Sequence, residues 1–228
     1  MAERFAVLIP AYNADKTLEQ VVAGAKRFVD TVIVVDDGSS DRTRKIAEAR
    51  ADRVLSHESN LGKGAALKTG LRWLRERGYE AAVTVDADTQ HDPSCIPSFL
   101  KTYANTECDL VLGARPFALG KMPALRLIAN RFSTFWVSFV CRRKILDSQC
   151  GFRLYRLAPL DFEALHCRGF DMETEVLIET CRRGGRVEAV EVPLIYRKGV
   201  GSHFGQIRDT LRVSRVIARY FLLWLRRK

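Results

Sequence analysis

An apolar run that ends in two carboxylates, one residue apart, is the feature that most constrains this chain. Val83 and Val85 suit a buried strand, whereas Asp86 and Asp88 are costly to bury as charges unless they are paired or bind a metal. Ligands of an open α/β sheet bind beyond the carboxyl ends of its strands. Carboxylate oxygens favour Mg2+ or Mn2+, and Mg2+ commonly binds one or two carboxylates together with the phosphates of a substrate. The sequence therefore predicts a metal site at Asp86 and Asp88 for a phosphorylated ligand.

An Asp-x-Asp pair by itself is also typical of a solvated turn after a strand. Here Pro93 follows the two acids and can open the next helix in its first turn. The segment is thus predicted to run strand, acidic loop, helix, and this context favours the binding site over the solvated turn.

Other predicted strands also lead into polar residues. Three further segments, at residues 5–10, 31–35 and 109–115, have the pattern of strands. The polar residues at or just beyond their ends are Tyr12, Asn13, Asp36, Asp37 and Arg115. Together with the acidic pair they form a convergent set suited to a metal-bound diphosphate and its sugar. Asp36 or Asp37 can accept hydrogen bonds from a ribose or a nucleobase, while a helix-capping turn explains the position of Asp37 equally well.

A glycine-rich turn at residues 60–66 opens a further predicted helix. Gly62 and Gly64 let backbone amides and Lys63 approach an anion at the helix N-terminus, and a glycine turn with a solvated lysine explains them equally well. The spacing of a nucleoside-triphosphatase P-loop is absent.

Acidic residues also mark the start of a helix predicted to begin near Phe170. Asp171 suits the N-cap, and Glu173 and Glu175 are favoured near the positive end of a helix. Capping and the helix dipole therefore account for all three acids.

The alternation of strands and helices predicts an α/β fold, and 228 residues, 47% of them apolar, are enough for one large core. A net charge of +10 indicates an anionic partner: nucleic acid, a phosphorylated substrate or a lipid head-group surface. The six cysteines lack zinc-site spacing, so reduced thiols in the cytosol are expected. The amino terminus has no apolar signal region that would predict export.

Two basic, amphipathic segments lie in the second half of the chain. Residues 120–141 interleave Arg and Lys with bulky apolar and aromatic residues, which suits either a core helix or a membrane interface. Residues 205–228 carry arginines at spacings of three and four opposite an apolar face, which suits either a partner domain or a lipid surface. No uncharged apolar run is long enough to predict a membrane-spanning helix.

Five motifs, in order, give the chain a family resemblance. They are Val-Leu-Ile-Pro-Ala-Tyr-Asn at 7–13, Val-Val-Asp-Asp-Gly-Ser-Ser-Asp at 34–41, Asn-Leu-Gly-Lys-Gly at 60–64, Asp-Ala-Asp-Thr-Gln-His-Asp-Pro at 86–93 and Gly-Ala-Arg at 113–115. Together they resemble a family 2 glycosyltransferase. The segments at 147–155 and 170–175 resemble the branch that makes dolichyl- or polyprenyl-phosphate glucose and mannose. The resemblance implies a glycosyltransferase-A fold with a Rossmann-like, mostly parallel sheet flanked by helices, a nucleotide-diphosphate sugar donor, and inversion at the anomeric carbon.

The resemblance also implies roles for residues of this chain. Nucleotide-sugar binding is expected of Pro10, Tyr12, Asn13, Asp36, Asp37, Lys63, Asp86, Arg197 and Lys198. A bound Mg2+ or Mn2+ is expected on Asp86, Asp88, Gln90 and His203. The implied catalytic set is Asp88, Arg115, Arg131 and Asp147. Residues 1–115 would form the nucleotide-sugar-binding core, and residues 116–228 the acceptor-side and C-terminal amphipathic region of one continuous catalytic domain.

The implied reaction is metal-dependent transfer of a hexose from the nucleotide sugar to a polyprenyl or dolichyl phosphate. A lipid phosphate is ionised near neutral pH and needs no general base, whereas a hydroxyl acceptor needs one, for which Asp147 is the candidate. Many members of the branch carry transmembrane helices after the catalytic domain. This sequence shows none, so a peripheral position at the cytoplasmic face of a membrane, or a membrane partner protein, is expected.

Two alternatives remain open from the sequence. One is a soluble family 2 glycosyltransferase that acts on a hydroxyl of a saccharide or small molecule. The other is a nucleic-acid-binding module, which the basic charge would suit but which acidic strand ends disfavour, because they repel a phosphate backbone.

Overall fold

The computed structural model of the protein describes residues 4–116, 124–193, 195 and 206–225. These residues contain one sheet of seven strands in the order β3-β2-β1-β4-β6-β5-β7. The strands are β1 (Phe5–Ala11), β2 (Val32–Asp36), β3 (Arg53–Ser56), β4 (Ala81–Thr84), β5 (Leu110–Ala114), β6 (Arg153–Arg156) and β7 (Val187–Glu191). Neighbouring strands are parallel except for β6, which runs antiparallel to β4 and β5. The predicted α/β fold with a mostly parallel sheet is confirmed.

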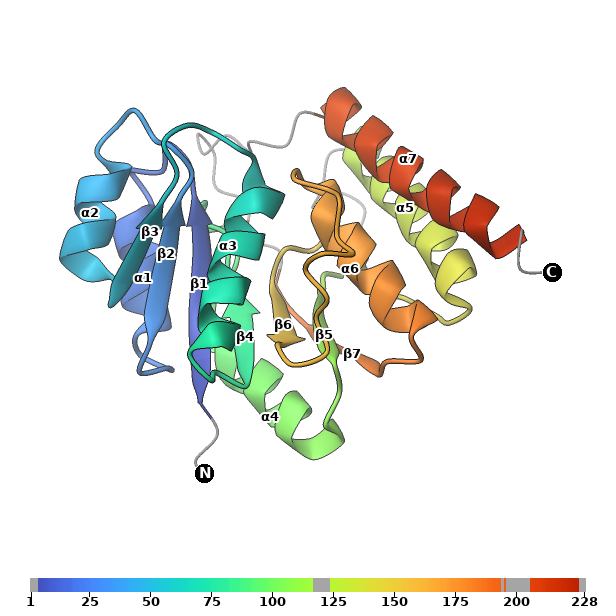
Figure 1. Ribbon diagram of the computed structural model, residues 1–228, viewed down its shortest axis with the longest axis horizontal. Coiled ribbons are helices and arrows are strands. Elements are labelled where there is room, and N and C mark those ends of the chain that lie inside the picture. The colour runs from blue at the N-terminus through green and yellow to red at the C-terminus, as the bar shows by residue number, and fades with distance from the viewer. Residues whose placement is uncertain (1–3, 117–123, 194, 196–205, 226–228) are drawn as a thin grey trace.

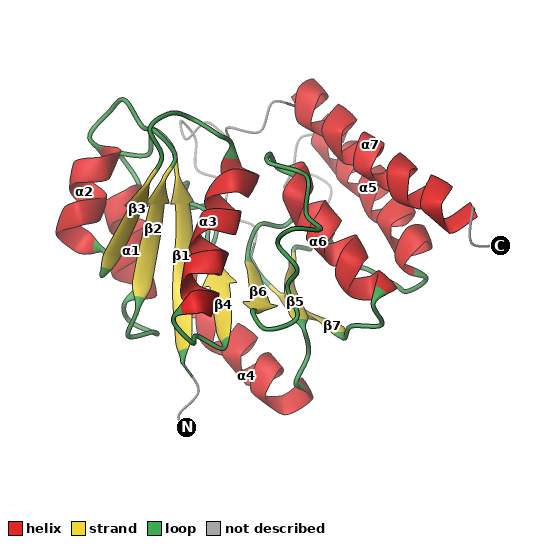
Figure 2. Ribbon diagram, in the orientation of Figure 1, coloured by secondary structure: helices red, strands yellow, loops and turns green. Residues whose placement is uncertain are grey.

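Helices cover both faces of the sheet (Figures 1 and 2). They are α1 (Leu18–Ala25), α2 (Thr43–Arg50), α3 (Lys63–Glu76), α4 (Ile96–Thr106), α5 (Ala124–Cys141), α6 (Asp171–Arg182) and α7 (Gln206–Leu225), with a 3₁₀ turn, η1 (Pro93–Cys95), before α4. Helices α5, α6 and α7 pack against one another, and α5 and α7 lie farthest from the sheet in Figure 1. None of the described helices combines the length and apolar character needed to cross a bilayer.

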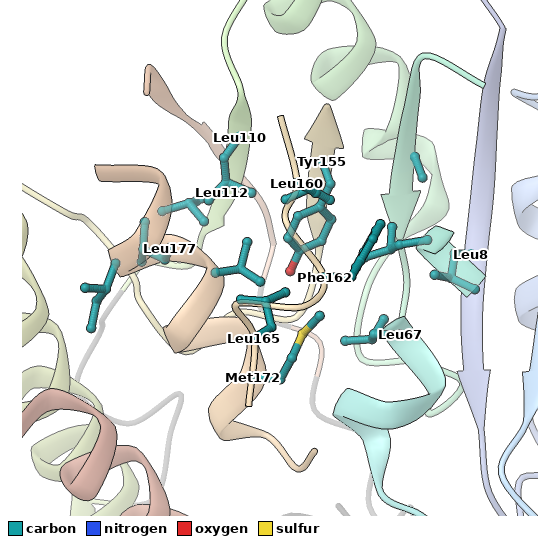
Figure 3. Close-up of a cluster of buried hydrophobic side chains, with 14 of the residues drawn as sticks. Leu8, Leu67, Leu110, Leu112, Tyr155, Leu160, Phe162, Leu165, Met172 and Leu177 are labelled. Carbon is teal, nitrogen blue, oxygen red and sulfur yellow. The ribbon is translucent and has the colours of Figure 1, made fainter. Parts of the chain in front are cut away.

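The alternating side chains of β1 divide the core into two layers, as the two-residue period of a strand requires. Leu8 packs into the layer that contains α3 and α6, whereas Val7 and Ile9 pack into the layer of α1 and α4. Figure 3 shows Leu8 in the first layer, with Leu67 of α3 on the same side of the sheet. Helix α3 can approach β1 closely because Gly70 has no side chain: a Cβ there would lie 2.3 Å from Leu8 Cδ1.

One edge of the sheet collects the polar strand ends. The parallel register places Ala11 beside Asp36 at the carboxyl ends of β1 and β2. Because β6 is antiparallel, Arg153 at its start pairs with Thr84 at the end of β4. The starts of α3 and α6 lie toward this edge as well (Figure 1). The fold therefore brings two helix starts to the edge where the sequence predicts a site.

Candidate active site

Lys63, the first residue of α3, lies between two carboxylates from distant parts of the chain. Its ammonium Nζ is 2.6 Å from Asp86 Oδ1 and 3.0 Å from Glu173 Oε2. The side chains of Lys63, Glu173 and Asp86 are 12%, 7% and 24% exposed. The ion pairs thus join α3, the end of β4 and the start of α6.

These contacts fix the charges of the group. Burial lowers the pKa of Lys63, but the carboxylates of Asp86 and Glu173 outweigh it and hold that pKa above its ordinary value. Burial likewise raises the pKa of Asp86, but the Lys63 ammonium and the neighbouring His91 hold it well below its ordinary range. Lys63 is therefore charged and Asp86 ionised near neutral pH.

The second acid of the pair behaves in the opposite way. Burial raises the pKa of Asp88, and the negative charge of Asp86 raises it further, although the backbone N–H of Gln90 donates a 3.0 Å hydrogen bond to Asp88 Oδ1. Two crowded carboxylates at a strand end are a donor set that suits a divalent cation bound together with substrate phosphates. Within the described ranges, no group of three His, Cys, Asp or Glu side chains could hold a metal ion. A cation at Asp86 and Asp88 would therefore need further ligands, such as substrate phosphates.

Gly151 leaves room for the ion pair of Lys63 and Asp86. A Cβ at Gly151 would lie 2.6 Å from Lys63 Nζ and 2.7 Å from Asp86 Oδ2. His91 is also close to this acid, with Nε2 3.6 Å from Asp86 Oδ2 and its ring packed on Phe152. Both the loop after β4 and the loop before β6 therefore contact Asp86.

Arg115, at the end of β5, forms a bidentate ion pair with Asp147. Arg115 Nε and Nη2 donate hydrogen bonds of 2.7 and 3.1 Å to the two carboxylate oxygens, and Asp147 is 0% exposed. Arg115 itself is also buried. Both oxygens of Asp147 are thus already hydrogen-bonded, and Asp147 belongs to the same loop before β6 as Gly151, which lies next to Asp86.

Arg153 connects these two groups. This fully buried arginine donates from Nε to Cys150 O at 2.8 Å, from Nη2 to Ser148 O at 2.8 Å and from Nη1 to Glu173 O at 2.6 Å. The loop that carries Asp147 is therefore held against the start of α6.

The predicted nucleoside side lies at the ends of β1 and β2. Pro10 is buried within β1, and Tyr12 is half-buried just after that strand. Asn13 has a left-handed backbone (φ 48°), and its Oδ1 accepts a 2.9 Å hydrogen bond from the Ser40 amide. Asp36 is buried and accepts from the Ser39 amide at 3.3 Å. The loops after β1 and β2 are thus joined directly.

Asp37 orders the turn in front of Lys63. Its oxygens accept hydrogen bonds from the amides of Leu61 (3.0 Å) and Gly62 (2.8 Å), and Oδ1 lies 2.6 Å from Nδ1 of His57. Gly62 has φ 99°, which a glycine adopts without strain. A positioning role for Asp37 is therefore visible, and its predicted contact with the nucleoside stays a prediction.

Some predicted residues are not joined to this site by the described contacts. Arg131 is exposed on α5, and none of the contacts among the described residues links it to Arg115 or Asp88. Arg197, Lys198 and His203 lie outside the described residues.

Glu173 lies in the first turn of α6, as its expected role at the helix start requires, but its ion pair with Lys63 was not predicted. Glu173 is 6% exposed. Glu175 is fully buried and accepts from the amides of His166 and Cys167 at 2.9 and 2.8 Å, which also differs from the expected role. Asp171 is the first residue of α6 rather than its N-cap, and its Oδ1 accepts from the Gly169 amide. The two-residue spacing of these acids, which cannot place all of them on one helix face, was the available signal.

The sheet order and the acidic residues after β4 fit the predicted glycosyltransferase-A fold. The model of glycosyl transferase family 2 matches residues 6–162. The chain therefore belongs to the family 2 glycosyltransferases, and the resemblance drawn from its motifs is confirmed.

Three relatives carry names that refer to polyprenyl- or dolichyl-linked phosphates. The chain is 32% identical over 206 residues to undecaprenyl-phosphate mannosyltransferase of Micrococcus luteus, covering 85% of this chain and 83% of that protein. It is 31% identical over 208 residues to polyprenol monophosphomannose synthase of Mycolicibacterium smegmatis, covering 85% and 77%. It is 30% identical over 213 residues to UDP-N-acetylglucosamine–dolichyl-phosphate N-acetylglucosaminyltransferase of Methanococcus voltae, covering 83% and 85%.

Solved structures share the fold. Glucosyl-3-phosphoglycerate synthase from Mycobacterium tuberculosis, in complex with Mn2+, UDP-glucose and phosphoglyceric acid, aligns with a TM-score of 0.71 and 23% identity over 97% of this chain and 79% of that one. At this identity the likeness establishes the glycosyltransferase-A fold.

Proposed function

We propose that the protein transfers a hexose from a nucleotide-diphosphate sugar to the phosphate of a polyprenyl-type lipid, with inversion at the anomeric carbon and with Mg2+ or Mn2+. The observation that carries the choice of acceptor is the state of Asp147. This residue is the candidate general base, yet it is 0% exposed and both its oxygens accept hydrogen bonds from Arg115. Because the carboxylate of Asp147 is already paired with Arg115, the site suits an acceptor that needs no general base.

A phosphate monoester meets that requirement, because its second pKa is about 6 and it is dianionic at neutral pH. One phosphate oxygen would attack the anomeric carbon as the bond to the leaving diphosphate breaks on the opposite face. No proton has to be removed from the nucleophile in this step. The names of three relatives, each a transferase acting on an undecaprenyl, polyprenol or dolichyl phosphate, support the same acceptor class.

The donor would bind at the carboxyl edge of the sheet. The joined loops after β1 and β2 would hold the nucleoside, and Asp86 and Asp88 would hold the metal. When bound, the cation stabilises the negative charge that accumulates on the leaving nucleoside diphosphate. Lys63 keeps Asp86 ionised and oriented toward this edge, which is the state that a metal ligand requires.

The test is release of nucleoside diphosphate from a panel of UDP- and GDP-sugars with Mg2+ or Mn2+, each with and without a short-chain polyprenyl phosphate. Turnover that requires the lipid phosphate is expected, and the active donor names the sugar. Turnover that ignores the lipid phosphate but responds to hydroxyl acceptors would overturn the proposal and favour a hydroxyl-acceptor transferase.

A pair of variants on one loop tests the metal site. Asp88→Asn removes a predicted ligand and should lower transfer by on the order of a hundredfold or more. Asp92→Asn is the matched control, because Asp92 accepts only the local Ser94 amide at 2.9 Å in the described structure. Equal activity of the two variants would remove the acidic pair from the mechanism.

A further inference from the structure

Helix α5 is apolar on two opposite faces. Leu127, Val137 and Val140 on its inner face are buried in the described structure. The outer face carries large apolar side chains at helical spacing, and they are exposed: Ile128 (65%), Phe132 (56%), Phe135 (63%) and Phe139 (48%). A surface helix of a water-soluble core normally keeps its second face polar. The outer face of α5 therefore has the composition of a contact surface.

Helix α7 extends this surface. Phe221 of α7 packs on Trp136 and Phe139 of α5, with ring centroids 6.3 and 6.1 Å apart. Leu211 and Leu222 of α7 are 54% and 57% exposed. We define the docking face as Ile128, Phe132, Phe135, Phe139, Leu211 and Leu222. These six residues account for most of the large apolar side chains that the described structure exposes, and such a concentration marks an interaction site.

The charge of the segments that carry the docking face is mainly positive, and α7 has four Arg residues and one Asp. The segment from Pro116 to Leu146 contains six Lys and Arg residues and no Asp or Glu. In the structure, exposed cations lie on α5 (Arg131), directly after it (Arg142 and Lys144) and on α7 (Arg215). Long basic side chains beside exposed aromatic rings match the polar and apolar layers of an anionic bilayer interface.

We propose that the docking face binds the surface of an anionic phospholipid bilayer, with α5 and α7 lying in the head-group layer. The inference extends the proposed function, because a bilayer is where a polyprenyl phosphate resides. Charge complementarity distinguishes this occupant from a second copy of the chain, whose matching face would bring the same arginines and lysines together.

The position of the docking face relative to the site fits this role. Helix α5 lies in the chain between Arg115 and Asp147, whose side chains form the buried ion pair of the candidate active site. Leu146, directly before Asp147, is 48% exposed. The segment that leads from α5 to this ion pair thus carries the exposed basic residues Arg142, Arg143 and Lys144 and the exposed apolar Leu146, a composition that also suits an anionic bilayer interface near the site.

The test is co-sedimentation of the full chain with vesicles of phosphatidylcholine alone or with about one third phosphatidylglycerol. Binding to the anionic vesicles is expected, with weakening when salt rises from about 0.1 to about 0.5 M because the exposed cations are then screened. Absence of binding to anionic vesicles at low salt would overturn the proposal. So would a dimer in light scattering that dissociates in the docking-face variants.

Two double variants test the residues. Phe132→Ser with Phe135→Ser removes two exposed rings, and binding should weaken by about tenfold or more. Both rings contact Trp136, so Ile128→Ser with Leu222→Ser provides a second test at exposed side chains away from those ring contacts. Lys45→Gln, at an exposed lysine on α2, is the control and should bind like the parent protein. Unchanged binding by both double variants would contradict the docking face.

Transfer assays separate this inference from the proposed function. The docking-face variants should keep activity toward a short, water-soluble polyprenyl phosphate and lose it toward a long-chain acceptor in vesicles. If no lipid phosphate is an acceptor but vesicles still bind through the docking face, the proposed function fails and this inference stands. If transfer to a lipid phosphate occurs but the protein does not bind vesicles, the proposed function stands and this inference fails.

Discussion

Lys63 Nζ lies 2.6 Å from Asp86 Oδ1, so the first residue of α3 is tied to the acidic end of β4. The same ammonium is 3.0 Å from Glu173 Oε2. The ammonium of Lys63 therefore forms ion pairs with two carboxylates in a largely buried group. Removal of this ammonium would break both ion pairs.

Lys63→Met should destabilise the protein by about 3–5 kcal/mol, because breaking a buried ion pair from one side leaves uncompensated charge. Urea unfolding followed by circular dichroism at pH 7 measures this loss. Lys45→Met, at an exposed lysine on α2, is the control and should unfold like the parent protein. Equal midpoints for the two variants would show that the Lys63 ion pairs contribute nothing to stability.

Gly151→Ala should preserve the fold and impair transfer. The new Cβ would lie within 2.7 Å of Lys63 Nζ and Asp86 Oδ2, and the end of a lysine side chain can shift at small cost. The displaced acid would reduce kcat/KM for the nucleotide sugar by on the order of a hundredfold. Gly113→Ala is the contrast, because its Cβ would meet Phe152 O at 2.8 Å and backbone cannot yield so easily. We expect Gly113→Ala to lose stability instead. A stable Gly113→Ala protein together with an unstable Gly151→Ala protein would contradict this prediction.

Asp41 should make stability depend on pH in the acid range. Burial raises the pKa of Asp41, but hydrogen bonds from Thr43 and from the Asp15 amide outweigh it and hold that pKa below its ordinary value. A carboxylate with a lowered folded-state pKa stabilises the protein above the unfolded-state pKa of about 3.9, and this stabilisation is lost as pH falls through the folded-state value.

Asp41→Asn should therefore be less stable than the parent protein at pH 7, and the difference should shrink below about pH 4. Thermal unfolding of the two proteins across pH 3 to 7 tests this. A difference that stays constant over that range would assign the effect to packing rather than to charge.

The thiols of Cys181 and Cys150 should differ sharply in reactivity. A hydrogen bond from Cys141 lowers the pKa of Cys181 below its ordinary value; burial opposes this and the Arg143 charge reinforces it. Burial raises the pKa of Cys150 to about 12. Because the thiolate is the reactive form, brief treatment with iodoacetamide at pH 7.5 should modify Cys181 before Cys150, as measured by peptide mass spectrometry. Cys141→Ala should slow modification of Cys181, and a faster reaction would contradict this role of the hydrogen bond.

The local parts of the fold could be predicted because they depend on local sequence. The run before Asp86 is apolar and ends abruptly, and strands and helices alternate through the first half of the chain, so the α/β fold and its acidic edge follow from the pattern. Strand β6 runs antiparallel to its neighbours β4 and β5. This direction depends on pairing between strands that are distant in the sequence, so it cannot be read from a short sequence pattern.

The site was predictable in part for the same reason. Asp86 and Asp88 follow a recognisable strand, but Glu173 is recruited by Lys63 from 110 residues away, and a helix start explains an acid there equally well from sequence. Asp147 was placed near the site by resemblance, yet its bidentate pair with Arg115 depends on packing between β5 and the loop before β6. Such pairings are properties of the folded chain.

Strands β5 and β6 are antiparallel neighbours, so the segment between them starts and ends at the same part of the sheet. Leu112 lies beside Arg153 in this pair, so the chain leaves the sheet after β5 and re-enters it at β6 at neighbouring points. The segment between β5 and β6, which includes α5, therefore has its two ends next to each other in the sheet. A change in the length or sequence of this segment can therefore be accommodated without a change in strand order.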